Sequence, residues 1–262
     1  MTWTDPFSDS RSRLALLAQS AAEWALFLDI DGTLLDIAES PELVHVPPTL
    51  IGDLERVSAS LQGALALVSG RAIQWIDQAF RPLRLPVAGQ QGAEIRLAAD
   101  GRVLTNAAVN LDEVRTRVRP LQGVDGIEIE DKGLSIAVHY RRAHDRAASA
   151  KALITSALAD LEDGIDMLPG RLVYEVKPRG VDKGKAVARL AQTAPFSRRM
   201  PVYFGDDHTD EYGFREVLAR GGIAVQVGPS PAPPGCLSIE SPSETRQWLA
   251  GLFAHAPEAA CT

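Results

Sequence analysis

The feature that most constrains this chain is a run of five apolar residues, 24–28, that ends directly in two carboxylates. An uninterrupted apolar run is typical of a strand buried on both faces of a parallel sheet. The residues that follow, 29–33, read Asp-Ile-Asp-Gly-Thr. Open α/β sheets bind their ligands at the carboxyl ends of the parallel strands. The pattern therefore predicts that Asp29 and Asp31 project into a binding crevice.

The residues at this strand end suit the chemistry of a phosphate. Two carboxylates so close repel each other unless a cation lies between them, and a hard divalent ion such as Mg²⁺ prefers oxygen ligands. Gly32 permits a tight turn, and Thr33 offers a hydroxyl and backbone N–H groups to an anion. Asp-Gly alone would indicate only a turn. The whole stretch instead indicates phosphoryl transfer.

A second apolar run, residues 64–68, ends in Ser69-Gly70-Arg71. A hydroxyl at a strand end, just before a helix expected to begin near residue 72, can hold a phosphate oxygen. Taken alone, Ser-Gly is more simply a loop entry or a helix cap. Arg71 either binds phosphate or pairs with Asp77, and the sequence leaves both interpretations open.

Two further stretches fit the same site. Lys183 precedes a helix expected over residues 186–192, where the helix dipole disfavours a cation unless an anion lies in front of it. The strand expected over residues 201–204 is followed by a second acidic cluster, which would repel itself without a cation. A solvated helix start explains its last two members but not its position after an apolar strand. The cluster consists of Asp206, Asp207, Asp210 and Glu211.

The composition is that of an ordinary globular protein. The 262 residues are 45% hydrophobic and 23% charged, and a chain of this length can form one large or two modest domains. The net charge of -7 argues against a nucleic-acid partner and against binding to a membrane surface. Residues 1–20 lack the apolar core of a signal peptide, and no apolar run would span a bilayer. A cytoplasmic enzyme is the expectation. Cys236 and Cys261 lack metal-ligand spacing.

The order of the elements predicts an α/β fold, a doubly wound, Rossmann-like parallel sheet with an inserted α+β cap domain. Short strands in adjacent pairs, with two helices, replace the parallel pattern in the middle of the chain. The core is expected over residues 1–90 and 176–262, and the cap over residues 91–175. Further helices are expected over residues 14–24, 49–61, 111–121, 145–161 and 245–254, and further strands over residues 85–88, 94–97, 126–130, 134–139, 223–227 and 237–239.

These motifs resemble those of the haloacid dehalogenase superfamily and, within it, of the trehalose-6-phosphate phosphatases, over nearly the whole chain. The most discriminating is the last, because many relatives carry Gly-Asp followed by Asn-Asp. One departure is Gln91, where the family commonly has histidine before Gly-Ala-Glu. The resemblance lies in Asp-Ile-Asp-Gly-Thr-Leu at 29–34, Ser-Gly-Arg at 69–71, Lys-Pro-Arg-Gly-Val-Asp-Lys-Gly at 177–184 and Gly-Asp-Asp-His-Thr-Asp-Glu at 205–211.

The resemblance implies a role for each matched residue of the core. Asp29 would be the nucleophile and Asp31 the general acid and base of a reaction that passes through an aspartyl-phosphate. Ser69, Gly70 and Lys183 would bind the phosphate. Mg²⁺ would be the cofactor. The implied metal ligands are Asp29, Asp31 through its backbone carbonyl, and Asp206, with Asp207 and Asp210 in support.

In the cap, residues 130–135 and 139–141 resemble the strands with which the family reads its sugar. Converging charges there can also be solvated ion pairs. The implied substrate is trehalose 6-phosphate, in trehalose biosynthesis, with a possible functional link to a trehalose-phosphate synthase. The alternatives are a phosphatase of another glycosyl phosphate and a catalytically silent sugar-phosphate-binding module that regulates a synthase. The candidate substrate-binding residues are Arg71, Glu130, Lys132, Arg141 and Glu175.

Overall fold

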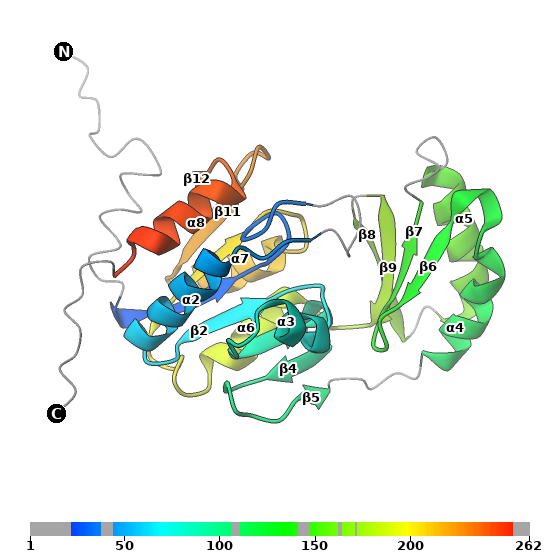
Figure 1. Cartoon of the computed structure of the whole chain (residues 1–262). Helices are drawn as coiled ribbons and strands as arrows, with labels where there is room; N and C mark the ends of the chain where they lie inside the picture. Colours follow the sequence, from blue (N-terminus) through cyan, green and yellow to red (C-terminus); the bar gives the residue numbers. More distant parts are fainter. Residues whose placement is uncertain are drawn as a thin grey trace, which may run out of the picture.

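The chain forms two sheets, and each sheet has its own hydrophobic core. Figure 1 shows the body built on the larger sheet on the left and the body built on the smaller sheet on the right. The computed structural model describes residues 22–37, 44–105, 111–140, 147–161, 164–170 and 172–253. The helix expected over residues 14–24 lies almost entirely outside these ranges, and Trp24 itself begins the first strand.

The larger sheet has eight strands, and its first strand lies near the middle. The strands are β1 (Trp24–Leu28), β2 (Leu65–Val68), β3 (Val87–Gly89), β4 (Glu94–Arg96), β5 (Leu104–Thr105), β10 (Met200–Gly205), β11 (Ile223–Val227) and β12 (Leu237–Ile239). Their order is β12-β11-β10-β1-β2-β3-β4-β5. All neighbours from β12 to β3 are parallel, whereas β4 and β5 are antiparallel. The carboxyl ends of β1, β2 and β10 therefore meet at one edge.

Helices cover both faces of this sheet, as the doubly wound prediction requires. They are α2 (Pro48–Ser60), α3 (Ile73–Ala79), α6 (Lys183–Ala191), α7 (Glu211–Ala219) and α8 (Pro242–Gly251). α2 packs beside α8 and α6 beside α7, on opposite faces. The side chain of Asp182 caps α6 by accepting a hydrogen bond from the N–H of Lys185. Because of this cap, α6 begins at Lys183, three residues before the sequence predicted.

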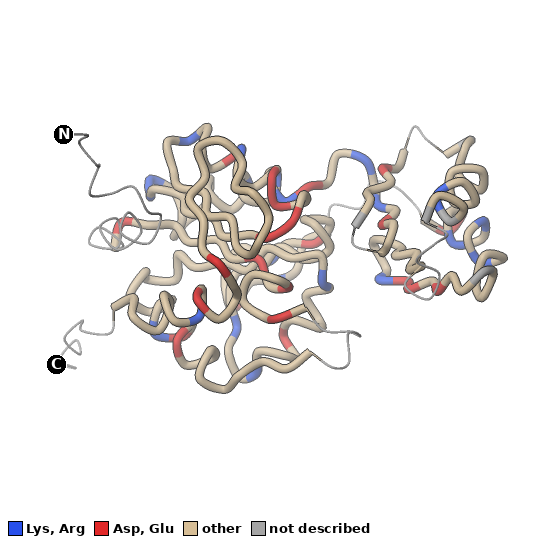
Figure 2. The backbone as a smooth tube through the Cα atoms, turned by 90° about the horizontal axis from the view of Figure 1, so that it is seen from above, with Lys and Arg blue, Asp and Glu red and all other residues tan. Residues whose placement is uncertain are grey.

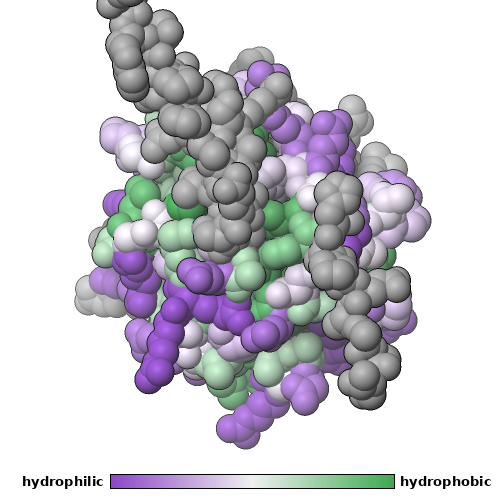
Figure 3. Space-filling view, turned by 90° about the vertical axis from the view of Figure 1, so that its left-hand side faces the viewer, coloured by the Kyte–Doolittle hydropathy of each residue, from purple (hydrophilic) through white to green (hydrophobic). Residues whose placement is uncertain are grey.

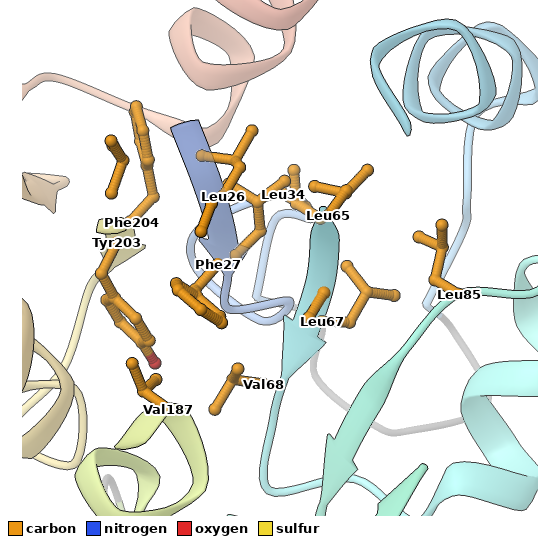
Figure 4. Close-up of a cluster of buried hydrophobic side chains, with 14 of the residues drawn as sticks. Leu26, Phe27, Leu34, Leu65, Leu67, Val68, Leu85, Val187, Tyr203 and Phe204 are labelled. Atoms are coloured by element: carbon orange, nitrogen blue, oxygen red, sulfur yellow. The ribbon is translucent and has the colours of Figure 1, made fainter. Parts of the chain in front are cut away.

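The core of the larger body explains why β1 can be wholly apolar. All five residues of β1 are buried, since the strand has β10 on one side, β2 on the other and helices on both faces. Figure 4 shows Leu26 and Phe27 of β1 among Leu65, Tyr203 and Val187 from neighbouring elements. A strand whose side chains are buried on both faces of the sheet removes the most apolar surface from water, and it gains most from the hydrophobic effect. The buried strand in turn fixes the position of the carboxylates that follow it.

The smaller sheet is antiparallel, in the order β6-β7-β9-β8. Its strands are β6 (Glu128–Asp131), β7 (Ile136–His139), β8 (Ile165–Gly170) and β9 (Val173–Pro178), and its helices are α4 (Asp112–Val118) and α5 (Ala147–Leu158). Figure 1 shows both helices on the side turned away from the larger sheet. The face of the smaller sheet that these helices do not cover is turned toward the larger body, as the predicted α+β insert requires.

The two sheets divide the chain at positions that differ from the bounds expected for the cap. β4 and β5 fall within the expected range of residues 91–175 but pair with the larger sheet, and β9 continues to Pro178 in the smaller one. The strand expected over residues 94–97 is present as β4, but it lies in the larger sheet, between β3 and β5. β8 was not expected at all. Its mixed sequence, Ile-Asp-Met-Leu-Pro-Gly, lacks a clear alternation, and Pro is unfavourable inside a strand.

Charge and hydropathy are distributed differently over the molecule. Figure 2 shows several acidic segments on the side of the larger body that is turned toward the smaller one. Figure 3 shows the opposite end, where hydrophilic and hydrophobic residues are intermixed. Within the described ranges, no helix has both the length and the apolar character needed to cross a membrane.

Candidate active site

Three carboxylates meet where β1 and β10 end. Asp29 follows β1, and its N–H donates to the carbonyl oxygen of Phe204 in β10. One carboxylate oxygen each from Asp29, Asp206 and Asp210 lies within 4.8 Å of the others. Gly32 adopts a left-handed φ of 82°, and a Cβ there would collide with the carboxylate of Asp206. Only glycine permits this approach.

Lys183 supplies the positive charge inside this cluster. Its Nζ donates to Asp29 Oδ1 at 2.8 Å and to Asp210 Oδ1 at 2.7 Å, and its side chain is 3% exposed. Tyr203 Oη also donates to Asp210 Oδ1, at 2.6 Å. The other oxygen of Asp210 accepts from the N–H groups of Asp206 and Asp207. Asp210 therefore organises the loop, while Asp29 and Asp206 keep more free acceptor capacity.

The electrostatics of the cluster follow from burial and from charges of both signs. Burial raises the pKa of the Asp29 carboxyl well above its usual range, although the Lys183 ammonium opposes this. For Asp206, burial and the carboxylates of Asp210 and Asp207 raise the pKa to about 7. Burial lowers the pKa of Lys183, but Asp210 and Asp29 outweigh it and raise that pKa well above its usual value. Three carboxylates against one ammonium leave the site acidic.

This donor set fits a divalent cation. Carboxylate oxygens are the ligands that hard divalent ions prefer, and a cation would relieve the repulsion that Lys183 offsets only in part. Asp29, Asp206 and Asp210 form the cluster that could hold it, in which Asp29 and Asp206 offer the free oxygens. Asp207 is directed elsewhere, because its Oδ1 accepts from the N–H and the hydroxyl of Thr209.

Asp31 and Arg71 form the second part of the site. The guanidinium binds the Asp31 carboxylate with two hydrogen bonds, Nε to Oδ2 at 2.6 Å and Nη2 to Oδ1 at 2.7 Å. It also lies 3.8 Å from the centre of the Trp75 ring. Asp77 instead binds Arg96. The interpretation in which Arg71 pairs with Asp77 is therefore wrong, and the planar guanidinium of Arg71 lies against Asp31.

Ser69 and Gly70 lie at the end of β2, as predicted. The hydroxyl oxygen of Ser69 is buried and accepts from the N–H of Arg71 at 3.2 Å. A Cβ at Gly70 would lie 2.8 Å from the side-chain nitrogen of Gln91. The loop is therefore packed against the turn that follows β3, a contact that the sequence analysis missed. Because the two segments are separated along the chain, no local pattern could have predicted it.

Of the predicted sugar-binding charges, Lys132 and Glu175 in β9 lie together. Lys132 Nζ lies 3.5 Å from Glu175 Oε1, and Ser135 Oγ donates to the same oxygen at 2.9 Å. Glu130 instead pairs with His139, whose Nε2 is 2.9 Å from its Oε2. The hydrogen bond with His139 lowers the pKa of Glu130. Arg141 falls outside the described residues.

One functional candidate escaped sequence reasoning altogether. Tyr203 lies within β10, is fully buried, and reaches Asp210 from the core side. Burial raises its pKa well above the usual value, so it stays a neutral donor. The sequence feature that could have indicated it is a tyrosine in an otherwise apolar strand, because a buried tyrosine hydroxyl usually finds a hydrogen-bond partner.

Comparison with known proteins points to one family. The sequence model described as trehalose-phosphatase matches residues 27–235. The chain is 42% identical to the probable trehalose-phosphate phosphatase of Sinorhizobium fredii, over 91% of each chain. It is 37% identical to the trehalose-6-phosphate phosphatase of Escherichia coli, over 79% of each chain.

A solved structure is similar in fold. The C-terminal domain of the Candida albicans trehalose-6-phosphate phosphatase superposes with a TM-score of 0.80 at 20% identity, covering 93% of this chain and 96% of that one. A haloacid dehalogenase-like hydrolase from Bacteroides thetaiotaomicron gives a TM-score of 0.64 at 17% identity, over 87% and 97% of the two chains. These likenesses confirm the predicted fold class. The match of the family's sequence model over most of the chain, together with the 42% identity to a relative, leads to one conclusion: the chain belongs to the trehalose-phosphatase family.

Proposed function

We propose that this protein hydrolyses trehalose 6-phosphate to trehalose and phosphate, as the names of its relatives say of them. The observation that carries the proposal is the buried contact of Asp29 with Lys183 inside an acidic cluster. Such a buried carboxylate, with a cation at one oxygen, suits attack on a phosphate whose own charge must be offset. Family membership then points to the sugar.

In the first half-reaction, a carboxylate oxygen of Asp29 attacks the phosphorus and the bond from phosphorus to the sugar oxygen breaks. Asp31 donates a proton to that oxygen as it leaves. In the second half-reaction, Asp31 accepts a proton from water, the water oxygen attacks the phosphorus, and the bond to Asp29 breaks. Lys183, Ser69 and Gly70 bind the phosphate throughout. The proposed cofactor is Mg²⁺, which Asp29, Asp206 and the backbone carbonyl of Asp31 would hold, with Asp207 and Asp210 in support; it would supply charge neutralisation.

Arg71 has a defined place in this scheme. Its two hydrogen bonds engage both oxygens of Asp31, and an acid that donates a proton cannot stay fully paired in this way. A phosphate group can also accept two parallel hydrogen bonds from a guanidinium, so it competes with Asp31 for Arg71. We therefore propose that Arg71 transfers at least one hydrogen bond to the substrate phosphate, which frees Asp31 to carry a proton.

We further propose that the smaller body is a cap domain that reads the sugar, with its boundaries after β5 and at Pro178. This proposal is supported by its separate core and by Glu175, which it places next to the core turn that follows β3. Glu130, Lys132 and Arg141 are the further proposed sugar ligands. A cytoplasmic location and a functional link to a trehalose-phosphate synthase stay predictions from the sequence.

Phosphate release from a panel of sugar phosphates tests the function. We expect trehalose 6-phosphate to have the highest kcat/KM and activity to require Mg²⁺, with reversible loss on chelation. A preference for glucosylglycerol phosphate or mannosylglycerate phosphate would assign another glycosyl phosphate. No release from any member, with or without Mg²⁺, would indicate a silent binding module.

A further inference from the structure

Two consecutive glutamines occupy the turn that follows β3. Gln90 and Gln91 belong to a 3₁₀ turn (Gln90–Gly92), and both are buried. Their φ angles of 47° and 61° lie in the left-handed region, which residues other than glycine seldom adopt. Backbone of this kind is often retained at functional sites. The side chains of this turn are therefore candidates for a functional role.

The backbone of this turn is fastened to the phosphate-binding loop. The N–H of Gln90 donates to the carbonyl oxygen of Arg71, and the N–H of Gln91 donates to that of Ser69, both at 2.9 Å. The side-chain nitrogen of Gln91 also packs against Gly70. Any displacement of the turn would therefore be felt where the phosphate binds.

The side chain of Gln90 is fully engaged in docking the smaller body. Its Oε1 accepts from the N–H of Leu134 at 3.0 Å, and its Nε2 donates to Glu94 Oε1 at 3.2 Å. Leu134 lies in the turn between β6 and β7, whereas Glu94 belongs to β4 of the larger sheet. Both ends of the amide have partners, so packing and docking account for Gln90.

The side chain of Gln91 differs in one respect. Its Nε2 donates to Glu175 Oε2 at 3.3 Å, but its Oε1 is buried and has no hydrogen-bond partner among the described residues. A carboxylate only accepts, so the nitrogen must face Glu175 and the oxygen is the free end. A buried acceptor without a donor is unfavourable. Gln91 is only 7% exposed, and a substrate group that enters beside it can supply the donor that the described residues do not.

We propose that Gln91 is a specificity-determining residue for the sugar. Its Nε2 orients Glu175, and its Oε1 accepts a hydrogen bond from a sugar hydroxyl close to the phosphorylated end, because Gln91 adjoins Gly70. The inference rests on the proposed function in that it takes a sugar phosphate as substrate. A purely structural amide would, like Gln90, have both ends satisfied within the protein.

Two variants of Gln91 test the inference in the full-length protein. Gln91→Met keeps the length of the side chain but removes donor and acceptor. We expect kcat/KM for trehalose 6-phosphate to fall about 10- to 100-fold. The fall for p-nitrophenyl phosphate, which has no sugar hydroxyl, should be at least tenfold smaller. Gln91→Glu keeps acceptor oxygens but places a negative charge against Glu175, so its loss on the sugar phosphate should be at least as large.

The matched control is Gln62→Met. Gln62 is also a glutamine with a left-handed backbone, φ 54°, but it lies at the opposite end of β2. It should change neither rate. Equal losses of Gln91→Met on both substrates leave the ratio of the two rates unchanged and would overturn the inference. A lowered Tm in that case would assign Gln91 a structural role. If the wild type prefers another sugar phosphate, the proposed function fails, and the same ratio measured with that substrate still decides the role of Gln91.

Discussion

At the scale of single residues, the site depends on how Lys183 is shared. Its ammonium touches both Asp29 and Asp210, and all three side chains are almost completely buried. Removing one partner from a buried group of charges usually lowers the free energy of unfolding by more than the whole group contributes to it. Here two carboxylates compete for one ammonium, so loss of one still leaves the other as its counter-ion. The nucleophile can therefore be neutralised without unfolding the protein.

Asp29→Asn provides the sharpest test of the nucleophile. The amide has nearly the shape of the carboxylate but is a poor nucleophile, so we expect phosphate release to fall by about a thousandfold or more. Tm should stay within a few degrees of the wild type, because Asp210 still pairs with Lys183. Phosphate release and thermal unfolding are measured on the same preparation. Asp100→Asn, in an exposed turn, is the control, and near-native turnover by Asp29→Asn would refute the assignment.

Metal binding should depend on pH through Asp206. Burial and nearby carboxylates raise its pKa to about 7, so below that pH the metal-free protein holds a proton that the cation must displace. Mg²⁺ affinity should therefore fall as the pH falls, by about tenfold between pH 8 and pH 6 for one proton. Titration calorimetry in buffers of different ionisation enthalpy measures both affinity and proton release. A dissociation constant that is the same at both pH values would contradict this.

At the scale of elements, the central strands could be predicted from the sequence, but the sheet that β4 and β5 join could not. β1, β2 and β10 are apolar runs that end in polar residues, and this pattern follows from burial on both faces. β4 and β5 are short, and their sequence does not show which sheet they join. Arg96 illustrates the reason. A charged residue in a short strand suggests exposure, yet Arg96 is fully buried because Asp77 and the carbonyl oxygen of Leu85 receive its guanidinium.

The ion pair that holds β4 should contribute to stability. Asp77→Asn leaves the buried guanidinium of Arg96 without its counter-ion, and we expect a loss of about 2–4 kcal/mol in the free energy of unfolding. Denaturant unfolding measures it. Asp53→Asn, which loses only a partly exposed contact with Arg56 in α2, should cost under about 1 kcal/mol. Similar values for the two variants would contradict the role of the pair.

The same ion pair gives a pH dependence of known sign. The hydrogen bond from Arg96 holds the pKa of the Asp77 carboxyl below its usual value. Its contribution is therefore complete above the usual carboxyl pKa and is lost as the pH falls through the lowered value. The difference in stability between the wild type and Asp77→Asn should shrink on acidification.

At the scale of the whole molecule, the decisive contacts join segments that are remote in the chain. The sequence pattern suggested that Glu130, Lys132, Arg141 and Glu175 converge, and of these Lys132 and Glu175 lie together. It could not predict that Ser135 and Gln91 would complete the surroundings of Glu175, because that depends on how the smaller sheet sits against the turn that follows β3. Glu175 is thus where the two bodies share a hydrogen-bond network.

That shared position leads to a separation between substrates. Glu175→Ala removes the group that Lys132, Ser135 and Gln91 all contact, while the cluster around Asp29 stays intact. We expect kcat/KM for trehalose 6-phosphate to fall about 100-fold, since a site built to hydrogen-bond hydroxyls discriminates strongly. p-Nitrophenyl phosphate needs only the core and should lose no more than about threefold. Glu113→Ala, on the exposed side of α4, is the control and should leave both rates unchanged. Equal losses on both substrates would mean that Glu175 supports the structure of the site rather than reading the sugar, and no loss on either would remove it from the site altogether.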